Sequence, residues 1–481
     1  MRIEKDAVGS LELNDELYGV QTKRALDNFP VTDQITDLNL IMNVVKIKKA
    51  ACLCNYNDNA FSKEVCEAIN KACDDVLNRK YDSSFVTPAI QGGAGTSINM
   101  NVNEVISNLA LLNLGFKLGE YNIINPNDTI NKCQSTNDVI PTAIKMTLIE
   151  YVKKLIVEVE KLKKTILHKA IEFKDVIKMA RTQLQDAVPM MLGQEFNAYA
   201  TMLDRPLNNL NKIINELHIV NLGASACGTA INVTPYYLDN IINYLNNITE
   251  EKFIQANDLF DCTSNVDIYS SLSGILKSLA LSLSKMSNDL RLLSSGPITG
   301  FKEINLPIRQ NGSSIMPGKI NPVIPEVMNQ IAFNVIGNDT TITCAVEAGQ
   351  LELNAFLPII ATKLFDSLLT LTKGIKTLNE NCCIGITANV EHLKNNVEHS
   401  AGISTVLCPY IGYLKASEVA HEAVDKNETV KEVVLEKHLL PEDKINKILN
   451  PSSLAFAHHL KEWIYNMLKI KKSKLRILLK K

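Results

Sequence analysis

One long run without helix-breaking residues constrains the fold more than any other feature of this chain. Residues 142–188 contain neither proline nor glycine, and within them apolar side chains recur at alternating spacings of four and three. These side chains are Leu148, Val152, Leu155, Val159, Leu162 and Ile166. Such a pattern predicts one continuous apolar face on a long helix.

Two further segments repeat this behaviour. An apolar stripe runs from Ile268 to Leu293, and residues 326–372 form a third long helical stretch in which Pro358 is the candidate for a kink. Alternating strand patterns are few and short, so we predict a mainly α protein. Helices of roughly 30 to 45 residues would be ~45–65 Å long. A single chain of this size can hardly bury helices of such length, which favours a long-helix bundle completed by other subunits.

These patterns divide the chain into three predicted helical domains. We expect an N-terminal helical domain (1–136), a central long-helix bundle domain (137–391) completed by tetramerisation, and a small C-terminal helical domain (392–481). Neither an internal repeat nor a low-complexity linker separates them. The basic residues of 469–481 predict a solvated, frayed end of the chain in preference to a membrane or RNA contact.

Composition excludes several classes of function. The 50 basic and 52 acidic residues of this 481-residue chain nearly balance, so no large positive surface for nucleic acid is expected. A secretory signal and a run of 18 apolar residues are both missing, which predicts a soluble cytoplasmic protein without membrane contact. The 11 cysteines are odd in number and the 8 histidines are not grouped with acids. We therefore expect reduced thiols and no metal site.

A glycine-rich segment at 91–97 resembles a phosphate-binding loop only superficially, because the Gly-Lys-Ser/Thr ending and a preceding strand are both missing. It leads into a predicted helix start at Thr96 and Ser97. Asn99 and Asn103 would share one face of that helix. The arrangement suits hydrogen bonding to a small polar ligand; the alternative is a capped helix start with solvated amides.

A second polar helix start occupies residues 131–138, just before the long helix. Its Ser135 and Thr136 hydroxyls would lie where a helix presents free N–H groups and the positive end of its dipole. Capping of the helix accounts for one of these polar residues, whereas a site that binds a carboxylate would need several of them. The segment 181–189 ends the same helical run in this interpretation, and its Arg and Gln residues alone indicate little.

Residues 312–326, hereafter the serine loop, carry the most specific pattern. Two adjacent serines lie between glycines, followed by Lys319 and Asn321 with prolines on either side. A Gly-Ser-Ser tripeptide by itself is more often a flexible linker, but a linker needs no fixed Lys, Asn and proline pair. The loop can close over a small anion, with Lys319 and Asn321 binding a carboxylate while a serine oxygen approaches carbon.

The serine loop resembles the signature of the aspartase/fumarase superfamily. The segments 96–101, 132–138 and 181–189 are similar to its aspartase branch, over nearly the whole chain. The resemblance implies a lyase that reversibly deaminates L-aspartate to fumarate and ammonia without an organic cofactor. Divalent metal activation, known in some relatives, is not indicated by any ligand cluster.

The resemblance also implies residue roles. Ser313 would remove the Cβ proton, and the resulting aci-carboxylate would be stabilised by donors that strengthen as charge develops. Main-chain N–H groups of the loop and Lys319 are the candidates for stabilising the ionised serine. The β-carboxylate would bind Thr96, Ser135, Thr136 and Ser314. The α-carboxylate would bind Thr182, Lys319 and Asn321, leaving Asn137 and Gln183 near the amino group.

Gln183 departs from the histidine that fumarases and some aspartases have at this position. Hydroxide departs more readily with an acid beside it, whereas an ammonium group leaves as neutral ammonia. A glutamine cannot titrate, so the site favours deamination over hydration. A class II fumarate hydratase remains the alternative enzyme, and a catalytically silent structural or binding homologue is the alternative from another class.

Family resemblance further implies a homotetramer whose active sites are each shared between three subunits. If the long helix were unbroken, Ser135 and Thr182 would be ~70 Å apart in one chain. One chain could not then bring both residues to the same small ligand.

Overall fold

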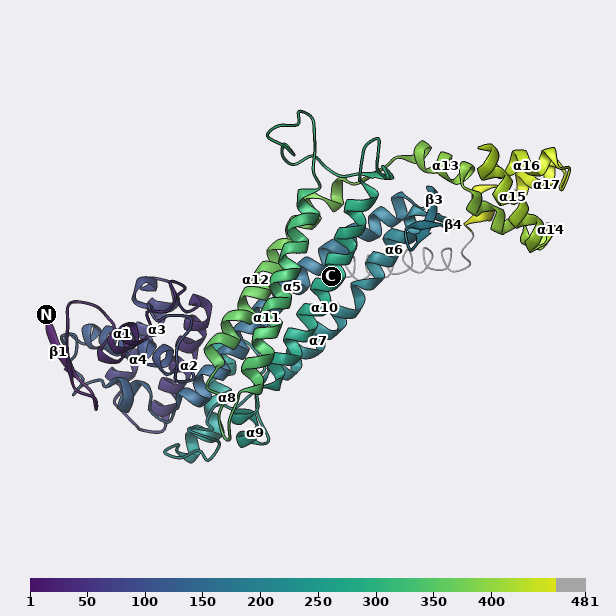
Figure 1. Ribbon diagram of the computed structural model, residues 1–481. Helices are drawn as coiled ribbons and strands as arrows, with labels where there is room; N and C mark the ends of the chain where they lie inside the picture. Colours follow the sequence, from purple (N-terminus) through teal and green to yellow (C-terminus); the bar gives the residue numbers. More distant parts are fainter. Residues whose placement is uncertain (456–481) are drawn as a thin grey trace, which may run out of the picture. The chain divides into compact units, whose positions relative to one another are not determined.

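The computed structural model describes residues 1–455 (Figure 1). These residues form two compact units. The first unit consists of residues 1–158, 206–281 and 330–373, and the second of 159–205, 282–329 and the residues from 374 onward. The described part of the chain is mainly helical, as predicted. The division into three domains stays a prediction, and the basic end at 469–481 lies outside the described residues.

The elements wholly within the first unit are mostly helices. They are β1 (Arg2–Lys5), β2 (Ser10–Leu13), α1 (Val20–Asn28), α2 (Leu38–Asn57), α3 (Lys63–Leu77), η1 (Asp82–Ser84), α4 (Thr96–Asn113), η2 (Pro126–Ile130), β5 (Ile219–Val220), α8 (Pro235–Thr249), β6 (Ile254–Gln255) and α9 (Leu259–Ser264). The β1–β2 pair is antiparallel and the β5–β6 pair is parallel.

The second unit contains the remaining short elements. They are β3 (Ile177–Thr182), β4 (Gln185–Met191), α6 (Leu192–Met202), β7 (Ile304–Asn305), η3 (Cys383–Gly385), β8 (Thr387–Ala388), α13 (Val390–His399), η4 (Ala401–Leu407), α14 (Cys408–Ile411), α15 (Tyr413–Lys426), α16 (Val430–Glu436), α17 (Glu442–Ile448) and α18 (Pro451–Leu454). Both of its strand pairs, β3–β4 and β7–β8, are antiparallel.

Long helices contribute residues to both units. They are α5 (Thr136–Glu172), α10 (Asp267–Leu293), α11 (Val323–Glu347) and α12 (Leu357–Asn381), with the shorter α7 (Asp204–Leu217). Within the first unit these helices contact one another. Tyr151 of α5 meets Phe365 of α12 with ring centroids 5.6 Å apart, and Ser273 of α10 donates to Asp339 of α11.

The apolar stripe of α5 behaves as predicted. All six side chains from Leu148 to Ile166 that define the stripe are fully buried. The α10 stripe is largely buried as well, with Leu272, Leu283 and Leu290 fully inaccessible. Helical spacing therefore identified the two faces that pack inside the protein.

The third predicted stretch is two helices, which corrects the expectation of one kinked helix. Helix α11 ends at Glu347 and α12 begins at Leu357. In between, the Asn354 amide donates to the carbonyls of Ala345 and Val346 at the C-terminal end of α11. Pro358 consequently lies in the first turn of α12, where a missing N–H costs nothing.

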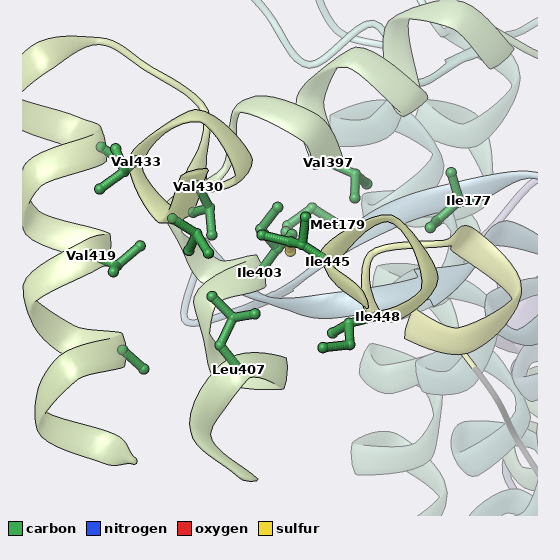
Figure 2. Close-up of a cluster of buried hydrophobic side chains, with 13 residues drawn as sticks. Ile177, Met179, Val397, Ile403, Leu407, Val419, Val430, Val433, Ile445 and Ile448 are labelled. Carbon is green, nitrogen blue, oxygen red and sulfur yellow. The ribbon is translucent and has the colours of Figure 1, made fainter. Parts of the chain in front are cut away.

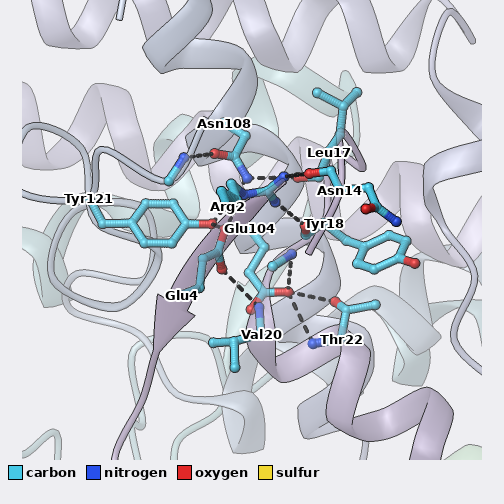
Figure 3. A network of polar contacts seen from close by, with 12 residues as sticks. Arg2, Glu4, Asn14, Leu17, Tyr18, Val20, Thr22, Glu104, Asn108 and Tyr121 are labelled. Carbon is cyan, nitrogen blue, oxygen red and sulfur yellow. Dashed lines mark hydrogen bonds and ion pairs between the residues drawn. The ribbon is translucent and has the colours of Figure 1, made fainter. Parts of the chain in front are cut away.

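A buried carboxylate holds the start of the chain against α4 (Figure 3). Glu104 of α4 accepts the main-chain N–H groups of Gly19, Gln21 and Thr22 and the Thr22 hydroxyl, at 2.6–3.1 Å. Burial raises the pKa of this carboxyl group, while the donors around it act in the opposite direction. The first turn of α1 is thereby fixed on the helix that begins with Thr96.

The C-terminal helices form their own apolar core within the second unit (Figure 2). Ile177 and Met179 of β3 pack there with side chains of α13, η4, α15, α16 and α17, among them Leu407, Val419 and Ile445. The base of the β3–β4 hairpin is therefore fixed by hydrophobic burial.

Within residues 1–455, no helix combines the length and apolar composition that a membrane crossing requires.

Candidate active site

Two helix starts meet in the first unit. Thr96 opens α4 and Thr136 opens α5, and the Asn99 amide lies 3.3 Å from the Thr136 hydroxyl oxygen. A Cβ on Gly95 would lie 2.9 Å from a methyl carbon of Ile140, and this glycine has φ +94°. Glycine is thus required for α4 to approach α5 so closely. We call Thr96, Ser135, Thr136 and Asn137 the helix-start cluster.

Hydrogen bonds within the cluster leave the helix ends well suited to an anion. Ser135 Oγ accepts the Asn137 N–H at 3.2 Å, and the Asn137 side chain donates to the carbonyl of Ala226 at 2.6 Å. The Thr96 hydroxyl is exposed and donates to the Gly93 carbonyl. Two helix N-termini side by side concentrate free N–H groups and positive dipole ends, which favours binding of a carboxylate.

The Asp138 carboxylate fixes the first turn of α5 through hydrogen bonds. Its carboxylate is buried and accepts the N–H groups of Ser135, Gly223 and Ser225 at 2.9–3.1 Å. Burial raises the pKa of Asp138 to about 6, and the three main-chain donors oppose this shift. The loop at 221–225 is consequently tied to the helix start.

Asn99 and Asn103 do share one face of α4, but that face points into the protein. Both are buried, and both donate to the Asn131 side-chain oxygen, at 3.1 and 3.2 Å. The alternative of solvated amides is therefore wrong, while direct binding of a ligand by these amides stays a prediction. They hold the segment at 131–134 against α4.

Residues 181–189 form part of a β-hairpin, which corrects the expectation that they end the long helix. Helix α5 stops at Glu172, and β3 pairs with β4 so that Thr182 lies opposite Gln185. Gln183 and Leu184 form the two-residue turn with φ values of 54° and 64°. Positive φ at both central residues is the geometry that matches the twist of a two-residue hairpin. Thr182 and Gln183 lie exposed at its tip.

A buried ion-pair group supports this hairpin. Glu303 is 1% exposed and pairs with Lys178 at 2.8 Å and with Arg181, both on β3. The Arg181 guanidinium also stacks over Phe301 at 4.3 Å. Glu303 immediately precedes β7, so it joins the hairpin to the segment that leads into the serine loop.

The serine loop is organised around the Ser313 oxygen. Ser313 Oγ accepts the main-chain N–H groups of Ile315 at 3.2 Å and Met316 at 2.9 Å. The ends of the loop are joined by Gly312 N–H donating to the Lys319 carbonyl at 2.9 Å and Asn321 Nδ2 donating to the Gly312 carbonyl at 2.6 Å. A Cβ on Gly312 would lie only 2.3 Å from the Lys319 oxygen, so this closure requires glycine.

The outer side of the serine loop is exposed. Ser314 and Lys319 face solvent, and Ile315 is 84% exposed. Lys319 has no ion-pair partner among residues 1–455. An exposed, unpaired ammonium group is suited to binding a carboxylate.

The predicted site residues therefore fall into separate groups. The first unit brings together Thr96, Ser135, Thr136 and Asn137. The second unit places Thr182 and Gln183 on the hairpin tip, and Ser313, Ser314, Lys319 and Asn321 on the serine loop. The sequence interpretation missed the residues that support them: the buried Lys48, Asp138 and Glu303, and the half-buried Asn131. In the described part of the chain, no group of three or more His, Cys, Asp and Glu side chains is placed to bind a metal ion.

Comparison with known proteins extends these local observations to the whole chain. Residues 11–337 match the Lyase family model, and residues 403–455 match the model for the fumarase C C-terminus. An aspartate ammonia-lyase of Helicobacter pylori is 46% identical over 465 residues, covering 96% of this chain and 99% of the relative. The chain belongs to the aspartate ammonia-lyase family.

Solved structures agree with this assignment. Fumarate lyase:delta crystallin from Brucella melitensis bound to cobalt is 42% identical with a TM-score of 0.92, covering 95% of this chain and 100% of that one. The class II fumarase of Schistosoma mansoni is more distant, at 32% identity, TM-score 0.91 and coverages of 95% and 99%. The protein is a lyase of the aspartase/fumarase superfamily.

Proposed function

We propose that this protein reversibly converts L-aspartate to fumarate and ammonia, with Ser313 as the base and no organic cofactor. The observation that supports this best is the pair of main-chain N–H groups on Ser313 Oγ. A serine hydroxyl is a weak base in its neutral form, and hydrogen bonds from donors favour its ionised form.

In the proposed reaction the Ser313 alkoxide takes the proton from Cβ, and the electron pair of the C–H bond moves into the β-carboxylate. The product is an aci-carboxylate with an extra negative charge. It collapses to the carbon–carbon double bond of fumarate as the Cα–N bond breaks, and the amino group leaves as neutral ammonia. Stabilising the added charge is where the rate acceleration arises.

The helix-start cluster is our candidate for binding the β-carboxylate. Thr96, Ser135 and Thr136 lie at two adjoining helix N-termini, and Ser314 would complete the set from the serine loop. Fixed donors and helix dipoles of this kind interact more strongly with the doubly charged intermediate than with the substrate, because their positions need no rearrangement.

We assign the α-carboxylate to Lys319, Asn321 and Thr182. Lys319 supplies the charge, while one Asn321 amide proton closes the loop through Gly312 and the other is left for substrate. Asn137 and Gln183 would lie near the amino group. Gln183 cannot donate a proton to a leaving hydroxide, and this favours aspartate over malate as the substrate.

We further propose a homotetramer in which three subunits contribute to each active site. Exposed apolar side chains on the long helices support this, including Leu281 of α10 and Phe333 of α11, at 50% and 63% exposure. Mixing an inactive Ser313→Ala variant with an inactive Thr182→Ala variant should restore part of the activity in hybrid tetramers. No recovery after verified subunit exchange would contradict shared sites.

A cytoplasmic location fits the thiols, because none of the eleven cysteines forms a disulfide. We propose no bound metal; activation by a divalent cation is tested by assays with and without a chelator.

The decisive experiment supplies the purified protein with L-aspartate or with L-malate and follows fumarate by its ultraviolet absorbance. We expect fumarate from aspartate and little or none from malate. Fumarate from malate alone would identify a class II fumarase, and fumarate from neither substrate would support the catalytically silent alternative.

A further inference from the structure

A fully buried lysine lies beneath the helix-start cluster. Lys48 of α2 is 1% exposed, and its ammonium group donates to Asn131 Oδ1 and Gln134 Oε1, each at 2.9 Å. In the described part of the chain, no carboxylate lies within ion-pair distance of it. Both of its partners are side-chain amide oxygens of the segment that leads into α5.

The Asn131 oxygen is the acceptor where several donors converge. Besides Lys48 it accepts the amides of Asn99 and Asn103, at 3.1 and 3.2 Å. Its own amide nitrogen donates to the carbonyl of Gln134. Because Lys48 can only donate, it keeps the Asn131 oxygen directed toward itself. The amides of Asn99 and Asn103 on α4 can then donate to the same oxygen.

This group of residues continues directly to the proposed β-carboxylate site. Asn99 lies one turn after Thr96 on α4, and its amide is also 3.3 Å from the Thr136 hydroxyl. Gln134 directly precedes Ser135. Lys48 thus contacts, through one intermediate side chain, both helix starts that we expect to bind substrate.

Nothing in the packing of α2 requires a charge at this position. Burial of an ammonium group is costly, and an apolar side chain of similar length would fill the same space. Burial lowers the pKa of Lys48 to about 7, partly offset by the nearby Asp138 carboxylate. Buried groups with shifted pKa values cluster at functional sites, and Lys48 lies next to the proposed one.

We infer that Lys48 is a positioning residue for the reaction: through Asn131 it holds the α4 and α5 starts in the geometry that stabilises the doubly charged aci-carboxylate. This inference rests on the proposed function. It predicts that Lys48 stabilises the bound intermediate more than the bound substrate, because the helix starts interact most strongly with the charge that develops during the reaction.

The test compares two inhibitors in wild type and Lys48→Met. Succinate mimics the substrate dicarboxylate, and the nitronate analogue of aspartate mimics the planar, charge-rich intermediate. We expect Lys48→Met to weaken nitronate inhibition about tenfold more than succinate inhibition. The ratio of two inhibition constants does not depend on the fraction of folded enzyme, so a general loss of structure leaves it unchanged.

Lys145→Met is the matched control. Lys145 is also buried in the first unit, but it donates to the Ile219 carbonyl and not to the segment at 131–134. We expect its inhibitor ratio to equal that of wild type. If Lys48→Met does not fold, Lys48→Met/Asn131→Leu removes the charge together with its acceptor, and the same loss of nitronate preference is expected.

An unchanged ratio in a folded Lys48 variant overturns the inference, and so does an equal change in Lys145→Met. Failure of the proposed function has a different signature, because wild type would then produce no fumarate from aspartate.

Discussion

The helix-start cluster and the serine loop present similar hydroxyl and amide groups, but their supports differ. Around the cluster, Lys48, Asn99 and Asn103 are buried and donate to the same Asn131 oxygen, and the buried Asp138 accepts the Ser135 N–H. In the serine loop, the Ser313 oxygen is held by the loop's own main chain, and the surrounding side chains are exposed. A preformed cluster suits binding of developing charge, whereas an exposed loop can admit substrate before it closes.

Removing the Ser313 hydroxyl should have the largest effect of any single change. We expect Ser313→Ala to lower kcat by about 10³-fold, because the proposed base is absent. Fumarate production measures this loss, and circular dichroism should show unchanged helix content. If turnover persists, the base lies elsewhere and the proposed contrast between the two regions disappears.

The serine loop should also depend on its backbone geometry. We expect Gly312→Ala to lower activity about 100-fold, because its Cβ would lie 2.3 Å from the Lys319 oxygen and open the loop. Gly274→Ala is the matched control, since no atom lies within 4 Å of a Cβ at that helical position. Equal activity of the two variants would show that loop closure does not position Ser313.

Glu303 and Glu195 allow a buried and a more exposed ion-pair partner of the β3–β4 hairpin to be compared within the second unit. Glu303→Gln leaves Lys178 and Arg181 without their shared buried partner, so we expect roughly 3–5 kcal/mol lower stability and a raised KM for aspartate. Glu195→Gln removes only the more exposed partner of Lys178 and should have a smaller effect. Thermal unfolding and steady-state kinetics measure both, and equal effects would contradict the assigned role.

The smallest expected effect, for a change of one pH unit, is a pH dependence of stability that comes from Lys48. Its pKa is lowered from 10.5 to about 7 in the folded protein, so between these values the folded state binds fewer protons than the unfolded state. Stability therefore rises with pH across this window, by at most about 1.4 kcal/mol per pH unit. The neighbouring Asp138 titrates below the window. Burial raises the pKa of Cys73 from 9.0 to about 12, and its contribution is removed by comparing wild type with Lys48→Met.

The measurement compares the unfolding free energy of wild type and Lys48→Met at several pH values between 7 and 10. The difference, wild type minus variant, should increase with pH. A flat difference would show that Lys48 is not the titrating group.

The sequence alone determined the helices, the two helix starts and the family. Apolar spacing in 148–166 and in 268–293 specifies helix faces locally, and Thr96 and Thr136 begin helices because cap-type residues and glycines precede them. The chemically specific residues of the serine loop are contiguous, so they could be read without any knowledge of the fold.

Only the tertiary structure decided what supports these residues. The hairpin at 177–191 was missed because Gln183 and Leu184 are unusual residues for a two-residue turn. Burial of Ile177 and Met179 stabilises the hairpin in spite of these turn residues. Lys48 lies one turn after Val44 on the buried face of α2. This spacing is visible in the sequence, but it does not distinguish a buried lysine from a solvated one. Its partners are more than 80 positions away in sequence, and only folding brings the amide oxygens to its ammonium group.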